Sequence, residues 1–205
     1  MVAASKKKNT LEQTGFALTD DGFTYCNKSY RFLDVIETRI LRSVLEHKVI
    51  LVGSEYHHSV SIMIGVKSGE LLQVTEQPTW LSDSKLNSVE HVENLFSVIS
   101  QKSWDNRVRK YTKQVNDVGC YEYNGWRFYP QQRKFHDTKS NKFYELSSVN
   151  LLKRYGFVAV KPKNEGLGSK FIRSLAGGQV GIGTLIDTDV FFALLKHFFD
   201  ISWDE

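Results

Sequence analysis

The strongest constraint on the fold of this chain is a short stretch that occurs twice. KSYRFLDV at residues 28–35 returns as KSNKFYEL at residues 139–146. The identical letters share an offset of 111 residues (139 − 28) and pair Lys28 with Lys139, Ser29 with Ser140, and Phe32 with Phe143. A repeat of this kind predicts that one structural unit is present in two copies.

Two further matches keep the same order along the chain. Phe16 and Phe23 correspond to Phe128 and Phe135 at an offset of 112 (128 − 16). LFSVISQKSW at 95–104 corresponds to LLKHFFDISW at 194–203, at an offset of 99 (194 − 95). Three matches in one order support an internal duplication, and the falling offset indicates that the second copy lacks about a dozen residues in its middle (111 − 99).

Strand signals fill most of each copy. In the second copy, two aromatic-rich runs flank Asn124-Gly125, which predicts a tight hairpin because both turn positions need positive φ. Five later runs predict further strands, at 133–137, 141–146, 156–161, 170–175 and 177–183. The first copy shows similar short runs, with Asp20-Asp21-Gly22 and Ser68-Gly69 as turns.

An amphipathic helix is expected at the end of each copy, because apolar residues recur there at spacings of three and four. In the second copy the apolar residues are Phe191, Leu194, Leu195 and Phe198, and the candidate N-caps are Asp187, Thr188 and Asp189. In the first copy they are Val92, Leu95, Phe96 and Ile99. A second stripe, out of phase with the first, contains Trp104, Val108, Tyr111 and Val115. We therefore predict a break near Ser103 and a helix end at Gly119.

About seven antiparallel strands followed by one closing helix resemble the pleckstrin-homology-like (PH-like) superfold, and the chain is similar to bacterial PH-like proteins in tandem. The resemblance implies a mainly β protein with helices (α+β), made of two tandem PH-like barrels. The expected parts are a tail at 1–13, a first PH-like domain at 14–104, a bridging helix at 105–118, and a second PH-like domain at 119–205. The alternative is one large α+β domain whose halves share a sheet.

Composition indicates an ordinary globular protein, with 41% hydrophobic and 24% charged residues. The N-terminal lysines at 6–8 are not followed by the apolar region of a secretory signal, and no aliphatic run is long enough to span a membrane. A cytoplasmic location is expected. Cys26 and Cys120 lack metal or redox spacing, and we expect reduced thiols.

No motif in the sequence carries catalytic chemistry. His57 and His58 are adjacent on an expected strand and would point to opposite faces, which is unsuited to a shared metal. The glycine-rich segment 164–183 lacks the phosphate-binding spacings and is better explained by turns. We expect no catalytic residue, no metal and no cofactor, and an enzyme with an unfamiliar site stays as an alternative.

Basic side chains concentrate in the second copy. Residues 127–175 hold eleven Lys or Arg and three Asp or Glu, whereas the first hundred residues hold ten basic and twelve acidic side chains. Membrane-binding PH domains hold anionic headgroups with basic residues around their first strands, although the Lys-x(n)-Lys/Arg-x-Arg spacing of that site is absent here. The resemblance implies a candidate anion-binding site at Arg127, Arg133, Lys134, Lys139 and Lys142.

These features favour a non-catalytic binding or scaffold module that recognises a protein, a peptide or an anionic membrane surface. Nucleic-acid binding is the alternative, because aromatic residues that are able to stack on bases alternate with the basic ones: Trp126, Phe128, Tyr129, Phe143 and Tyr144. Those aromatic residues are also expected to fill the cores. Self-association through an apolar face of a terminal helix fits either function.

Overall fold

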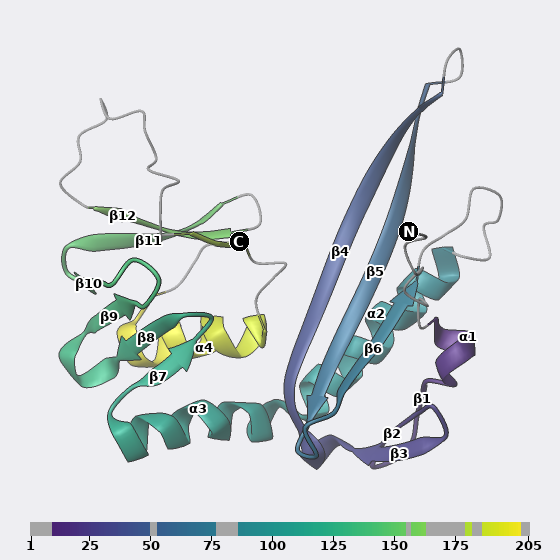
Figure 1. Cartoon of the computed structure of the whole chain (residues 1–205), viewed down its shortest axis with the longest axis horizontal. Helices are drawn as coiled ribbons and strands as arrows, with labels where there is room; N and C mark the ends of the chain where they lie inside the picture. Colours follow the sequence, from purple (N-terminus) through teal and green to yellow (C-terminus); the bar gives the residue numbers. More distant parts are fainter. Residues whose placement is uncertain are drawn as a thin grey trace, which may run out of the picture. The chain divides into compact units, whose positions relative to one another are not determined.

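A computed structural model describes residues 10–49, 53–76, 86–154, 157–162, 179–181 and 186–201. The chain divides into two compact units, Met1–Asn106 and Arg107–Glu205. Together the described residues form an α+β protein with four helices and four antiparallel sheets (Figure 1). Each sheet has a linear strand order, so none of the described sheets closes on itself. None of the described helices is long and apolar enough to span a membrane.

The first unit contains two three-stranded sheets. Its elements are α1 (Leu11–Thr14), β1 (Ala17–Leu18), β2 (Gly22–Tyr25), β3 (Lys28–Arg31), the 3-10 turn η1 (Phe32–Asp34), β4 (Val35–Val49), β5 (Gly53–Val66), β6 (Leu71–Glu76) and α2 (Leu86–Lys102). The sheet orders are β1-β2-β3 and β4-β5-β6. β4 and β5 form a long hairpin that extends well past the end of β6 (Figure 1).

The core of the first unit follows from strand and helix periodicity. Alternate residues of β5, namely Val60, Ile62 and Ile64, are buried, as period-two alternation requires. Helix α2 contributes the stripe that the sequence predicts, because Val92, Leu95 and Ile99 are buried and Phe96 packs against the same core. The predicted break is confirmed, since α2 ends at Lys102 and α3 begins at Trp104.

The second unit repeats the order of sheet, meander and helix. Its elements are α3 (Trp104–Val118, which begins in the first unit), β7 (Tyr121–Tyr123), β8 (Trp126–Tyr129), η3 (Pro130–Gln132), β9 (Lys134–Asp137), β10 (Lys142–Glu145), β11 (Val149–Arg154), β12 (Phe157–Pro162), β13 (Gln179–Gly181) and α4 (Thr188–Phe199). The sheet orders are β7-β8-β9-β10 and β11-β12-β13. The expected strand at 170–175 lies outside the described residues.

Local signals of the second unit act as the sequence predicts. Asn124 and Gly125 have φ of 48° and 84° and join β7 to β8 in a tight turn. Gly119, with φ of 74°, ends α3. Asp187 precedes α4, but its side chain makes no capping hydrogen bond. Asp187 therefore occupies the predicted N-cap position without the side-chain hydrogen bond of a cap.

The two units share an aromatic ladder across a hairpin. In the first unit Phe23 lies opposite Tyr30, with ring centroids 5.6 Å apart. In the second unit Phe135 lies opposite Tyr144, with centroids 5.0 Å apart. A third ring continues each ladder at 5.4 Å: Phe16 beside Phe23, and Trp126 beside Phe135. Aromatic pairs of this kind stabilise a hairpin beyond the contribution of the apolar area that they bury.

The ladder corrects the register of the repeat. Lys28 and Lys142 each begin the second strand of the hairpin, so their offset is 114 residues (142 − 28) rather than 111. The predicted pairing of Lys28 with Lys139 is wrong, because Lys139 lies in the turn that precedes β10. This turn is longer in the second unit, Thr138–Asn141 against Cys26-Asn27. The sequence comparison aligned identical residues without allowing for this difference in turn length.

Candidate functional site

The predicted anion-binding residues lie on or beside the β7-β8-β9-β10 sheet, but several already have partners. Arg127 of β8 is exposed and pairs with Glu122 of β7, with 3.0 Å between guanidinium Nε and carboxylate Oε2. Arg133 follows η3 with φ of 47°, and its guanidinium donates to the carbonyl of Phe199 at 3.1 Å. Arg133 thus binds the last carbonyl of α4, and the C-terminal end of a helix favours a positive charge.

The three predicted lysines differ in their surroundings. The ammonium of half-buried Lys134 lies 5.8 Å from the ring centroid of Tyr129 and 5.6 Å from that of Phe143. Lys139 and Lys142 are both exposed, and the backbone amide of Lys139 donates to Asp137. None of these contacts joins two of the five residues directly.

Two of the five predicted base-stacking aromatics are core residues, and two more are half-buried. Trp126 and Phe128 are buried, whereas Tyr129 and Tyr144 are half-buried. Phe143 is the exception, because it is 60% exposed and stacks on His136 at 4.2 Å between ring centroids. Among the five predicted residues, all of which the structure describes, one open aromatic ring lies beside Lys134 rather than a row of stacking platforms.

A buried ionic network that the sequence did not predict joins α3 to the start of α4. Arg107 is fully buried, and its guanidinium contacts Asp189 at 2.8 and 2.7 Å and Asp187 at 3.0 Å. Tyr111 donates its hydroxyl to the second oxygen of Asp187 at 3.0 Å. Burial opposes the charge of Arg107, but the contacts with Asp189 and Asp187 outweigh it and raise the pKa of the guanidinium. This network links α3 to the start of α4 within the second unit.

Two tyrosine hydroxyls in the second unit provide a matched test of buried hydrogen bonding. The Tyr121 hydroxyl is buried without a hydrogen-bond partner among the described residues, and burial raises the pKa of Tyr121. Tyr121→Phe is expected to leave the free energy of unfolding unchanged or raise it by up to about 1 kcal/mol. Tyr111→Phe removes a donor from buried Asp187 and should lower it by about 1 to 3 kcal/mol. Urea unfolding of both variants checks this, and a larger loss for Tyr121→Phe contradicts it.

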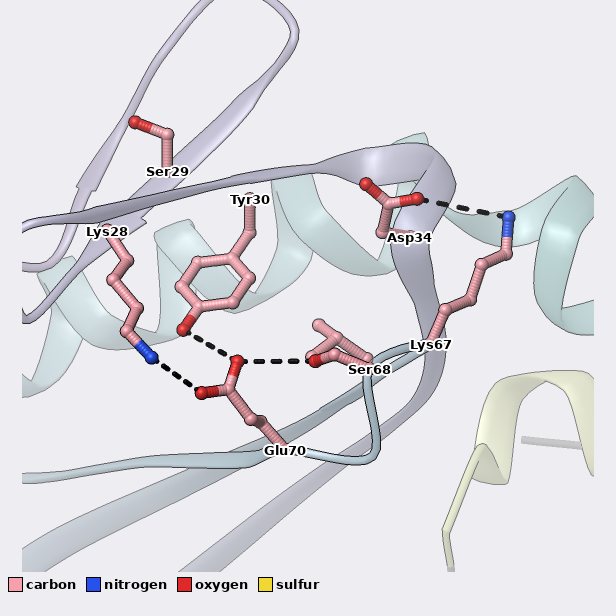
Figure 2. A pocket seen from close by; sticks show the side chains of 8 residues that line it. Lys28, Ser29, Tyr30, Asp34, Lys67, Ser68 and Glu70 are labelled. Atoms are coloured by element: carbon pink, nitrogen blue, oxygen red, sulfur yellow. Dashed lines mark hydrogen bonds and ion pairs between the residues drawn. The ribbon is translucent and has the colours of Figure 1, made fainter.

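A polar hollow in the first unit brings together residues far apart in the sequence. Its volume is about 590 Å³, and its walls come from β3, η1 and the turn between β5 and β6. The lining residues are Lys28, Ser29, Tyr30, Asp34, Val66, Lys67, Ser68 and Glu70. Figure 2 shows the Lys28 and Lys67 side chains at opposite ends of this hollow, with Glu70 between them. A second hollow, of about 320 Å³, lies beside Arg133 and Glu145 in the second unit.

Two carboxylates organise the hollow. Glu70 accepts hydrogen bonds from Lys28 at 2.7 Å, Tyr30 at 3.1 Å and Ser68 at 3.2 Å (Figure 2). Asp34 accepts two from Arg31, at 3.0 and 3.3 Å, and its ion pair with Lys67 is long at 4.0 Å. Each carboxylate thus has its own donors, which fix the side chains around the hollow.

These contacts shift the pKa values of the ionisable groups. The hydrogen bond from Lys28 lowers the pKa of Glu70, and the same bond raises the pKa of Lys28. The hydrogen bond from Arg31 lowers the pKa of Asp34. Burial, followed by the hydrogen bond to Glu70, raises the pKa of Tyr30. All four groups therefore keep their ordinary charge states near neutral pH.

The pH response of the hollow follows from the Glu70 contacts. A depressed carboxylate pKa stabilises the fold above the ordinary glutamate range, and this stabilisation is lost as the pH falls through the folded value. Lys28→Gln is expected to raise the pKa of Glu70 toward its ordinary value, because the largest cause of the shift is removed. An NMR titration of the Glu70 carboxyl carbon measures the change. Lys142→Gln is the control, and an unchanged Glu70 pKa in Lys28→Gln contradicts the assignment.

The hollow contains donors that are able to bind an anion, among them the ammonium of Lys67. Ser68 donates to the carboxylate of Glu70, and no histidine is among the described residues that line the hollow. Among the described residues, no group of three or more His, Cys, Asp or Glu side chains is placed to hold a metal ion. The sequence identified Ser68-Gly69 as a turn, but not that this turn closes on β3.

Comparison with protein-family models, with curated proteins and with solved structures gave no match to this chain.

Proposed function

We propose that the chain is a non-catalytic binding module, built from two PH-like units in tandem, which recognises a protein or peptide. Support for the PH-like architecture comes from the element order of each unit: an antiparallel sheet, a three-stranded meander, and then a helix. The shared aromatic ladder supports a duplication. We also propose that the protein acts in the cytoplasm, as the sequence leads us to expect.

The observation that carries the proposal is the hollow of the first unit. It is open to solvent, its polar side chains are fixed by mutual contacts, and the side chains of Lys28 and Lys67 are more than half exposed. A preorganised open site of this kind suits recognition of a group on a larger partner. Nucleophilic catalysis by a serine commonly uses a histidine as its base, and no histidine is among the described residues that line the hollow.

The experiment that tests this proposal also distinguishes two other classes of ligand. An anionic membrane is the ligand expected if exposed Lys139 and Lys142 act together, as the PH-like resemblance implies. Single-stranded nucleic acid is favoured by one observation, the open ring of Phe143 beside the ammonium of Lys134.

Selection from a displayed random-peptide library against the intact chain tests the proposal. We expect enrichment of peptides that share a consensus, and binding of the synthesised consensus peptide to the free chain. Anionic vesicles and single-stranded DNA are assayed in parallel. Failure to enrich a consensus, together with retention on vesicles or DNA, would overturn the proposal.

A further inference from the structure

We infer that the hollow of the first unit binds one carboxylate group of an acidic residue in the peptide ligand, with Lys67 as its main cation. This inference rests on the proposed function, because it names the chemistry of the ligand. It concerns the residues on β3, η1 and the β5–β6 turn, none of which belongs to the anion site expected from the sequence.

The charge of the ionic network around the hollow favours a group with a single negative charge. Lys28, Lys67, Asp34 and Glu70 line the hollow, and Arg31 pairs with Asp34 from outside this lining, so the three cations and two carboxylates of the network carry a formal net charge of +1 (3 − 2). One ligand carboxylate brings this sum to zero. A dianionic phosphoryl group would leave it negative and would place two charges beside Glu70, which is unfavourable for like charges.

Lys67 is the cation with the most unused capacity. Glu70 holds Lys28 at 2.7 Å, and Asp34 holds Arg31 through two hydrogen bonds, whereas Lys67 lies 4.0 Å from its carboxylate. The Lys67 side chain is 54% exposed, and an ammonium has three N–H donors. The hydroxyl of Ser68 follows it in the same turn and lines the same hollow. An incoming carboxylate can bind Lys67 without breaking the Glu70 or Arg31 contacts.

Exposed apolar residues adjoin two of the lining residues along the chain, which favours a peptide over a small carboxylic acid. Leu33 directly precedes Asp34 and is 64% exposed, and Leu71 directly follows Glu70 and is 55% exposed. The remaining volume accommodates more than one carboxylate group. We therefore expect a ligand segment with an acidic residue flanked by apolar residues.

The test is an NMR titration of the intact chain with the capped peptide Ala-Leu-Glu-Leu-Ala, using Ala-Leu-Gln-Leu-Ala as the uncharged control. The expected result is saturable shifts of the Lys67, Ser68 and Glu70 amides with the glutamate peptide. The glutamine peptide should bind at least about fivefold more weakly, because it lacks one exposed ion pair. Lys67→Gln should cause the same loss, and Lys67→Glu should abolish binding. Lys142→Gln is the matched control and should bind normally.

Three results of these titrations would overturn the inference: equal binding of the glutamate and glutamine peptides, unchanged affinity in Lys67→Gln, and displacement of the peptide by inorganic phosphate at lower concentration than by acetate. Amide spectra of each variant verify that the fold is kept. A consensus peptide that lacks an acidic residue, or that shifts amides elsewhere, would overturn the inference and leave the proposed function intact. The two failures are therefore distinguishable.

Discussion

Arg107→Met is expected to lower the free energy of unfolding of the second unit by about 3 to 5 kcal/mol, because it leaves a buried carboxylate without its cation. Arg107 and Asp187 are both fully buried, and Tyr111 alone would remain to donate to Asp187 among the contacts described above. Replacing one partner of a buried pair costs far more than the pair itself contributes. Hydrogen exchange of the backbone amides of the second unit, across a denaturant series, measures the loss.

Arg127→Met is the matched control, because it removes the same side chain from an exposed pair with Glu122. It should change stability little, since exposed ion pairs contribute little. Adding Asp187→Asn to Arg107→Met should recover part of the loss by removing the buried charge. Similar losses for Arg107→Met and Arg127→Met would contradict the role of the network.

Phe23→Ala and Phe135→Ala are each expected to lower the free energy of unfolding of their own unit by about 3 to 5 kcal/mol. Both rings are fully buried at the centre of the aromatic ladder, where truncation leaves a cavity between two neighbouring rings. Hydrogen exchange of backbone amides identifies which unit loses protection.

Phe143→Ala is the control for the ladder variants, because this ring is 60% exposed and lies outside the core. Its effect should stay within about 0.5 kcal/mol. A loss for Phe23→Ala but none for Phe135→Ala would contradict the equivalence of the two hairpins.

Local features of the fold were predictable from the sequence, because neighbouring residues determine them. The break at Ser103 follows from a shift in helical phase, and the β7–β8 turn follows from Asn124-Gly125. The register of the repeat was not predicted, because the two hairpin turns differ in length. The sequence comparison paired Lys28 with Lys139, which are identical residues, instead of aligning the aromatic rings of the two hairpins.

Long-range contacts account for what the sequence left out. Asp187 stands at a position where a carboxylate normally caps a helix, but Arg107, eighty residues earlier, takes its side chain instead. Likewise, the sequence does not identify Lys67 and Glu70 as site residues, because the site forms only when their turn contacts Lys28 and Tyr30 of β3. The count of basic residues pointed to the second unit, but the sequence did not predict that Arg127 contacts Glu122 or that Arg133 contacts the carbonyl of Phe199.

Retention across a salt series on three matrices tests the binding-module account most directly: an immobilised acidic peptide, anionic vesicles and single-stranded DNA. The proteins are the wild type, Lys67→Gln and the double variant Lys139→Gln/Lys142→Gln. The account predicts retention on the peptide that weakens with salt, is lost in Lys67→Gln and is kept in the double variant. Retention on vesicles or DNA that only the double variant loses would contradict it, and would identify the second unit as the binding surface.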